Sequence, residues 1–201
     1  PFTNDGTATV VRLSEMFRVL KDFQIPPRWS GYLNHGYGYP LFNFVYPLPY
    51  FLAILVYFFH FGLVNTMKII FAMTVPLSGI AMFLAARKLW KNNWAAVICS
   101  LLYLYLPYRL VNLYVRGSIG ESISTIFYPL IIWLSPSLPL TALAFGGLIM
   151  AHNIAAVYFL PIAGIFFLSQ ILTDKKGEAF LFALALILGL GIAAFFWLPA
   201  L

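Results

Sequence analysis

Acidic side chains are almost absent from the middle of this chain. Between Asp22 and Asp174 the only one is Glu121, which ends the polar segment Tyr114-Val-Arg-Gly-Ser-Ile-Gly-Glu121. Of the 201 residues, 62% are hydrophobic and only 9% are charged, whereas soluble domains are about one-quarter charged. The composition therefore predicts an all-α membrane protein. A carboxylate in such surroundings costs about 3 kcal/mol to bury, which makes Glu121 a candidate functional residue.

The positive charges and the cysteine exclude two classes of function. The formal net charge is +6, but Lys and Arg fall mostly in short clusters beside hydrophobic segments, a pattern that sets membrane topology and does not indicate nucleic-acid binding. Cys99 is the only cysteine, so no disulfide framework or cysteine-based metal site is expected. Because the chain has no initiator Met or signal peptide and stops directly after a hydrophobic run, we expect a fragment that continues beyond both ends.

The first 43 residues are predicted to form an external loop with an amphipathic helix. Residues 7–23 separate apolar from charged side chains at helical spacing but are too polar to span a bilayer, so this helix suits a membrane surface. Its apolar side holds Val10, Leu13, Phe17 and Leu20, and its other faces largely hold Arg12, Glu15, Arg18, Lys21 and Asp22. Residues 40–61 are interrupted by prolines, and only about half a span is continuously apolar. We therefore prefer a re-entrant segment there over a full crossing.

Residues 44–201 are predicted to form a polytopic transmembrane helical bundle. Its apolar segments are 64–86, 94–106, 122–134, 138–150, 154–172 and 179–198. Basic residues follow two of them, and these clusters indicate cytoplasmic turns: Arg87, Lys88 and Lys91, then Lys175 and Lys176. Four crossings between the two turns place residues 114–121 and His152-Asn153 on the external side. Asp5 lies on that side too if residues 40–61 are re-entrant.

Several of these segments are shorter than a full span. Irregular backbone at membrane depth persists only where it is buried in protein or lines water, so we expect a cavity that opens to the outer face. Arg116 is the expected partner of Glu121. Whether the two form a structural ion pair or part of a functional site is left open by the sequence.

The other polar candidates each have an ordinary structural explanation. Asp5, ahead of the amphipathic helix, suits an N-cap or an Asp-Gly turn. His152 and Asn153 suit the cap of a helix break or a bond between neighbouring helices. Tyr37 and Tyr39 suit anchoring at the headgroup level, although tyrosine rings also stack on sugars.

Phrase-length motifs along the whole chain point to a more specific hypothesis. They are Asn4-Asp-Gly6, Phe23-Gln-Ile-Pro-Pro-Arg-Trp29, Gly36-Tyr-Gly-Tyr-Pro-Leu-Phe42, Tyr108-Arg-Leu-Val-Asn-Leu-Tyr-Val-Arg-Gly117, Ala151-His-Asn153 and Phe196-Trp-Leu-Pro199. With an Asp in the first external loop followed by an amphipathic helix, the chain resembles the GT-C superfamily of membrane glycosyltransferases. It resembles most closely the N-terminal part of a bacterial multispanning family often labelled "6-pyruvoyl-tetrahydropterin synthase-related". The three histidines lack the close spacing of a pterin-synthase zinc site.

The resemblance implies transfer of a sugar from a polyprenyl-phosphate donor to an acceptor at the outer face of the bacterial plasma membrane. It implies Asp5 as the general base on the acceptor hydroxyl. Arg116, with Arg109 behind it, would stabilise the departing phosphate, and Glu121 would be a second acid. The expected substrate-lining residues are His152, Asn153, Tyr37 and Tyr39.

The cofactor and the function class both keep alternatives. The resemblance allows a divalent metal ion, Mg²⁺ or Mn²⁺, but the family's usual Asp-x-Asp pair is absent because Gly6 follows Asp5. A transporter or lipid flippase also gathers broken helices around polar groups, and a non-catalytic membrane scaffold would use the same residues to pair helices. An enzyme requires Asp5 and Glu121 on one side of the membrane. A transporter instead predicts that Glu121 lies deep.

Overall fold

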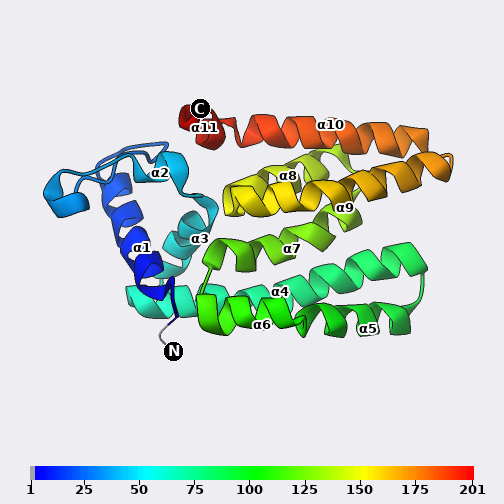
Figure 1. The fold of residues 1–201 in the computed structure, drawn as a ribbon, viewed down its shortest axis with the longest axis horizontal. Coiled ribbons are helices and arrows are strands. Elements are labelled where there is room, and N and C mark those ends of the chain that lie inside the picture. The colour runs from blue at the N-terminus through cyan, green and yellow to red at the C-terminus, as the bar shows by residue number, and fades with distance from the viewer. Residues whose placement is uncertain (1–2) are drawn as a thin grey trace.

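The computed structural model describes residues 3–201 and confirms the all-α expectation. Within that range the regular structure is helical, with one isolated bridge between Ser30 and Tyr39. The helices are α1 (Gly6–Lys21), η1 (Asn34–Gly36), α2 (Leu41–Phe44), α3 (Leu48–Tyr57), α4 (Leu63–Trp90), α5 (Asn93–Leu104), α6 (Pro107–Val111), η2 (Asn112–Arg116), α7 (Ile119–Leu134), α8 (Leu138–Ala151), α9 (Asn153–Leu172), α10 (Lys176–Ile192), α11 (Ala194–Trp197) and η3 (Leu198–Ala200). Helices α4 to α10 form an elongated antiparallel bundle, and α1 to α3 cover one of its ends (Figure 1).

The helices of the bundle fall into two groups by length, and the shorter group holds α7, with 16 residues, and α8, with 14. Helices α4 and α9 are long and apolar enough to cross a membrane, and two bent helix pairs raise the number of candidate spans among the described residues to four. One bend, of 45°, separates α5 from the Pro107–Arg116 segment, because Pro107 begins a new helix there. The other, of 47°, divides the single helix expected at residues 179–198 into α10 and α11. The protein is therefore a helical membrane protein.

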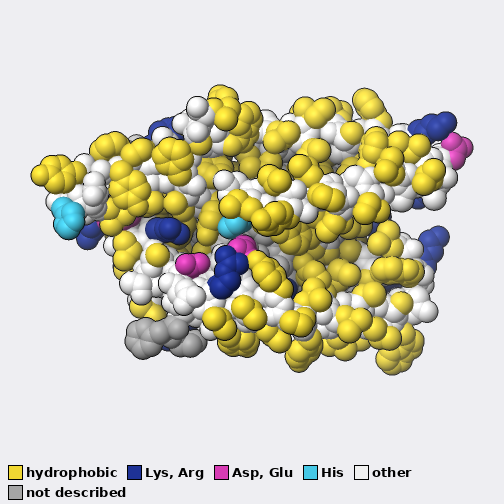
Figure 2. Space-filling view, in the orientation of Figure 1, with side chains coloured by type: hydrophobic (Ala, Val, Ile, Leu, Met, Phe, Trp, Pro, Cys, Tyr) yellow, Lys and Arg dark blue, Asp and Glu magenta, His cyan; other side chains and the backbone are white. Residues whose placement is uncertain are grey.

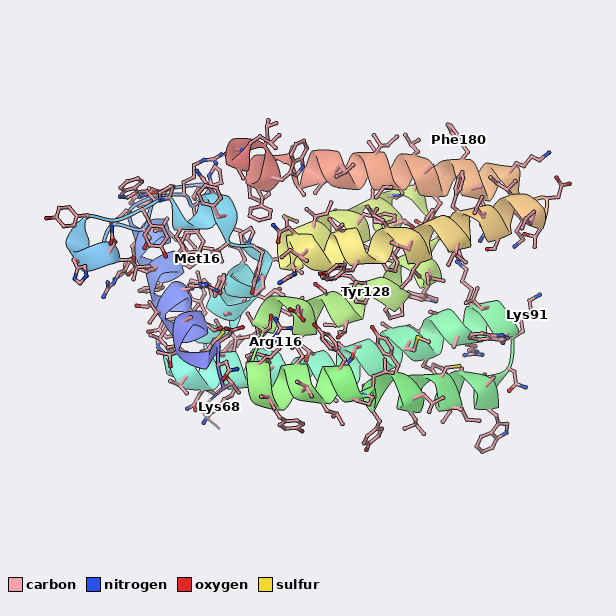
Figure 3. The ribbon with its side chains drawn as sticks, in the orientation of Figure 1. Met16, Lys68, Lys91, Arg116, Tyr128 and Phe180 are labelled. Atoms are coloured by element: carbon pink, nitrogen blue, oxygen red, sulfur yellow. The ribbon has the colours of Figure 1, made fainter. Side chains whose placement is uncertain are left out.

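The two basic turns lie at the same end of the bundle, in agreement with the topology count. The α4–α5 and α9–α10 connections meet at the right of Figure 1, whereas the connections from η2 to α7 and from α8 to α9 lie at the left, beside α1. Lys91 labels the basic end and Arg116 the opposite end in Figure 3. The charged and histidine residues proposed for the site thus belong to segments at the end of the bundle opposite the basic turns.

Helix α1 matches the expected amphipathic helix, but its apolar face packs on α3 and α4. Leu13, Met16 and Val19 enter one core with residues of α2, α3, α4, α7 and α8. The assignment of Glu15 to the polar faces was wrong. Glu15 is buried and accepts hydrogen bonds from the Ser30 hydroxyl and from Arg18 Nη1, the latter at 3.0 Å. Its carboxylate therefore ties the following loop to α1, a tertiary contact that helical spacing cannot reveal.

Residues 40–61 do not form a continuous crossing. The chain forms α2, turns through Pro47 and then forms α3, a helix of ten residues that rises about 15 Å, half the hydrocarbon thickness. Helix α3 packs against α1, α4, α7 and α8 at the left end of the bundle (Figure 1). This geometry agrees with a segment that returns to the side from which it started.

Candidate functional site

A cavity of about 280 Å³ lies between the bent α5–η2 segment, α7 and the α8–α9 junction. It runs along α7 from Glu121 to Tyr128, a rise of about 10 Å. Aromatic rings and a few polar groups make up its wall: Tyr103, Leu106, Tyr108, Arg109, Asn112, Glu121, Thr125, Tyr128, His152, Ala155 and Tyr158. An apolar wall with convergent polar groups is typical of ligand pockets.

Glu121 forms the polar centre at the mouth of this cavity. Arg116 binds it in a bidentate manner, with Nη2 2.9 Å from Oε1 and Nη1 3.0 Å from Oε2. The Tyr108 hydroxyl donates to Oε2 at 2.6 Å and accepts from Arg116 Nη1 at 2.9 Å. The Glu121 side chain is 15% exposed and that of Arg116 41% exposed. The expected ion pair is therefore present, and it accounts for the charge of both side chains.

His152 lies beside this pair at the break between α8 and α9. Its Nδ1 accepts the Ala155 N–H at 3.1 Å and so caps α9, which leaves the proton of the neutral ring on Nε2, 4.0 Å from Glu121 Oε1. Burial lowers the pKa of His152, and the nearby Glu121 opposes part of that shift. His152 is therefore a neutral helix cap and at the same time part of the cavity wall.

Tyr46 connects this cluster to the first loop. Its ring centroid lies 4.9 Å from that of His152, and the ring is stacked on Tyr50 at 6.4 Å. Gly120 permits this approach, because a Cβ there would lie 2.6 Å from the Tyr46 ring and 2.5 Å from the Ala151 carbonyl oxygen. Burial raises the pKa of Tyr46, and the positive charge of Arg12 acts against the shift.

Arg109 reaches deeper than any other charged group of the cavity. Its guanidinium donates to Thr125 Oγ1 and to the Thr74 carbonyl, both at 3.1 Å, and lies over the Tyr103 ring. Thr74 is on α4, about 17 Å from its start. Arg109 is 8% exposed and has no carboxylate partner within residues 3–201. A buried charge is normally paired, so Arg109 is the cavity group with an uncompensated charge.

A second polar group of the wall has spare hydrogen-bonding capacity. Asn112 is 3% exposed and donates through Nδ2 to Ser122 Oγ at 3.4 Å. Its Oδ1 has no hydrogen-bond partner among the residues described. Because buried acceptors are usually satisfied, Asn112 Oδ1 is an unusual unpaired acceptor in a residue of the cavity wall.

Asp5 lies at the same end of the molecule, held there by its backbone. Its N–H donates to the Arg116 carbonyl at 2.8 Å, and the Asn4 N–H donates to the Val115 carbonyl at 3.1 Å. Gly117, with φ +70°, lets the chain turn against Thr3. The Asp5 carboxylate makes no capping bond, and within the described range it makes no hydrogen bond or ion pair. The N-cap explanation therefore does not account for this carboxylate.

Not every residue singled out from the sequence lies in the cavity. Glu121, Arg109 and His152 line it, and Arg116 covers Glu121. Asn153 is exposed at the start of α9, and Tyr37 and Tyr39 lie in the loop around η1. These three residues line neither cavity that we describe, and Asp5 also lines neither of them. Their wall positions are taken by Tyr103, Tyr108, Tyr128 and Tyr158.

The sequence reasoning missed Arg12, Tyr46 and Tyr108. Arg12 was assigned only to the polar side of α1, but its half-buried guanidinium faces Tyr46 and Tyr50. Tyr108 stands in one of the motifs and could have been found there as a neighbour of Arg109. Tyr46 had no signal beyond its aromatic surroundings.

The charge distribution on the surface agrees with this geometry. In Figure 2 basic, acidic and histidine side chains gather near one another on a face that is otherwise largely hydrophobic. No group of three His, Cys, Asp or Glu side chains with metal-binding geometry occurs in the described part of the chain. The described residues do not form a site for the divalent metal that the resemblance allows, and no step is assigned to one.

Comparisons with known proteins find one distant similarity. The chain is 23% identical over 218 aligned positions to an uncharacterized protein of Lactococcus lactis subsp. cremoris strain MG1363. That alignment covers 98% of this chain but only 35% of the relative, so the chain spans about a third of the length of that protein. No family model and no solved structure matches.

Proposed function

We propose that this chain forms part of a GT-C-like glycosyltransferase that uses a lipid-phosphate sugar donor at the face opposite the basic turns. The observation that carries the proposal is the backbone bond from Asp5 to Arg116. It brings an unpaired carboxylate to the segment that carries the arginines, although the two residues are far apart in sequence. A general base and phosphate-binding cations are the two kinds of group that the reaction requires.

The charges of the site favour an anionic ligand. Glu121 cancels the charge of Arg116, and His152 is a neutral helix cap. The charge of Arg109 is left without a carboxylate partner inside the cavity, whereas the unpaired Asp5 carboxylate is not part of the cavity wall. A phosphate in the cavity would balance this charge. We therefore rank Arg109 ahead of Arg116 as the phosphate-binding residue, the reverse of the order expected from the sequence.

The proposed chemical step assigns one role to each of these groups. Asp5 accepts the proton of the acceptor hydroxyl while the hydroxyl oxygen attacks the anomeric carbon of the donor. The bond from that carbon to the phosphate oxygen breaks, and the electron pair leaves with the lipid phosphate. Arg109 stabilises the charge that develops on the phosphate, and Arg116 contributes when it moves from Glu121. The attack on the face opposite the leaving group inverts the anomeric centre.

The arrangement favours an enzyme over a transporter. A transporter requires no relation between Asp5 and Glu121, whereas the Asp5–Arg116 backbone bond and the Arg116–Glu121 ion pair hold both acids at one end of the bundle. Arg109 is the deep group of the cavity, and its side chain is fixed by two hydrogen bonds.

The proposal is tested with the full-length protein in membranes, a labelled polyprenyl-phosphate sugar and the Asp5→Asn variant. Loss of a general base should lower turnover by roughly 10²- to 10⁴-fold. Asp22→Asn is the matched control, because Asp22 is an exposed acid at the other end of α1. Equal turnover of Asp5→Asn and wild type would reject Asp5 as the base. Absence of transfer by the wild type from any polyprenyl-phosphate sugar would reject the function itself.

A further inference from the structure

A second and larger cavity, of about 890 Å³, lies outside the site described above. It is a groove between the first turns of α1, the outer half of α4 and the segment from η2 to Gly117, and we call it the α1–α4 groove. Val64, Met67, Phe71 and Val75 of α4 form much of its floor. The paired backbones of residues 4–5 and 115–116 connect the two regions, because Thr3 and Gly117 line the groove and Arg116 binds Glu121.

The groove combines an apolar floor with one cationic group. Lys68 is the only charged residue of the wall as the structure describes it, and no acidic side chain lines the groove over that range. Lys68 makes no ion pair or side-chain hydrogen bond within residues 3–201. The wall also holds the hydroxyls of Thr3, Thr7 and Tyr114, which can donate hydrogen bonds. This combination is complementary to a negatively charged headgroup with a hydrocarbon chain.

The position of Lys68 along α4 fits the same kind of ligand. Helix α4 is long and apolar enough to span a membrane and begins at Leu63, so Lys68 lies about 8 Å from its start. Figure 3 shows Lys68 at the end of the bundle opposite Lys91. Lysine near the end of a spanning helix extends its ammonium group toward the headgroups. The groove therefore lies at the level where lipid headgroups are expected beside a spanning helix.

We infer that the α1–α4 groove binds an anionic phospholipid, with the phosphate at Lys68 and part of an acyl chain along Val64, Phe71 and Val75. The volume is within the range of sites that enclose a ligand. The lipid would fill the space between α1 and α4 and so hold α1, and with it Asp5, against the bundle. The inference does not require the proposed function, because lipid binding is measured without turnover.

The first experiment compares phosphatidylglycerol with phosphatidylcholine of the same acyl chains, added to the purified full-length protein and retained in native mass spectrometry. One lysine near a headgroup is worth about 1 kcal/mol, or about fivefold in affinity. Wild type should retain phosphatidylglycerol about fivefold better, and Lys68→Gln should abolish the preference. The control is Lys176→Gln at the opposite end, where the side chain is also exposed; it should keep the preference.

The second experiment places a photo-crosslinking amino acid at Ala72 in the wall of the groove. A lipid adduct that is competed by phosphatidylglycerol supports the inference. A crosslink to another segment of the protein shows that protein covers the groove and overturns it. An equal preference in Lys68→Gln and Lys176→Gln also overturns it, because Lys68 then serves only as a general membrane anchor.

Discussion

Replacing Glu121 with Gln removes one negative charge and leaves the shape of the side chain almost unchanged. The amide oxygen of the introduced glutamine can still accept one hydrogen bond from Arg116, but the bidentate, charge-assisted pair and the acceptor for Tyr108 are weakened. Because the carboxylate is 15% exposed and the guanidinium 41% exposed, solvent screens part of the attraction. The expected destabilisation lies between that of an exposed pair, below about 1 kcal/mol, and that of broken buried pairs, about 3–5 kcal/mol.

We therefore expect Glu121→Gln to lower the free energy of unfolding by about 1–2 kcal/mol. A double-mutant cycle with Arg116→Gln isolates the pair, and the coupling energy should be about 1 kcal/mol. Unfolding in mixed micelles of increasing denaturing detergent, followed by tryptophan fluorescence, gives these values. The control cycle combines Glu121→Gln with Lys176→Gln at the opposite end of the bundle and should show no coupling.

Two results would refute this reasoning. A coupling near zero means that Arg116 and Glu121 do not form the ion pair in the membrane. A decrease of several kcal/mol in the free energy of unfolding of Glu121→Gln means that solvent does not screen the pair, although Arg116 is partly exposed. In the proposed enzyme, Glu121→Gln should also reduce turnover far less than Asp5→Asn, because Glu121 supports the phosphate-binding arginines and does not accept the proton.

Two further predictions concern the same end of the bundle. Burial lowers the pKa of His152 in the folded protein, so below about pH 6.5 the unfolded chain binds more protons than the folded chain. The contribution of His152 to the free energy of unfolding should therefore be constant above that pH and should fall as the pH decreases. His152→Asn keeps a capping acceptor and should make the unfolding midpoint less dependent on pH between about pH 7 and 5; an unchanged slope would exclude His152 as the cause. Gly120→Ala places a methyl group against the Tyr46 ring and the Ala151 carbonyl and should lower the free energy of unfolding by about 1–3 kcal/mol. The control is Gly164→Ala, which has open space around the glycine and should be neutral or slightly stabilising. Equal unfolding midpoints for the two variants would contradict the packing described.

The order of the elements was largely predictable from local sequence. Long apolar segments and the proline interruptions located most of the bundle helices, and the clusters of Lys and Arg placed the two basic turns at one end. The bend between α10 and α11 was missed, because residues 179–198 read as one continuous apolar segment. The place of Glu15 was also missed, because its partner Ser30 is distant in sequence.

The candidate site was only partly predictable for the same reason. Glu121 and Arg116 are five residues apart, so their ion pair followed from their sequence. The packing of α5 to α9 decides three other features of the site, which local sequence does not show. They are the lack of a carboxylate partner for Arg109, the unpaired acceptor of Asn112 and the positions of the four tyrosines of the wall. Tyr37 and Tyr39 were chosen for residue type alone, and the structure places them in a loop away from both cavities.

The sequence by itself determined that this protein is a helical membrane protein with its polar residues and its basic turns at opposite ends. Hydrophobic length and charge position are one-dimensional properties, and the bilayer acts on them directly. Only the tertiary structure decided which arginine remains uncompensated, that the Asp5 carboxylate is free, and that Asp5 meets Arg116. These properties depend on contacts between residues far apart in the chain, where burial and the choice of partner are settled by packing.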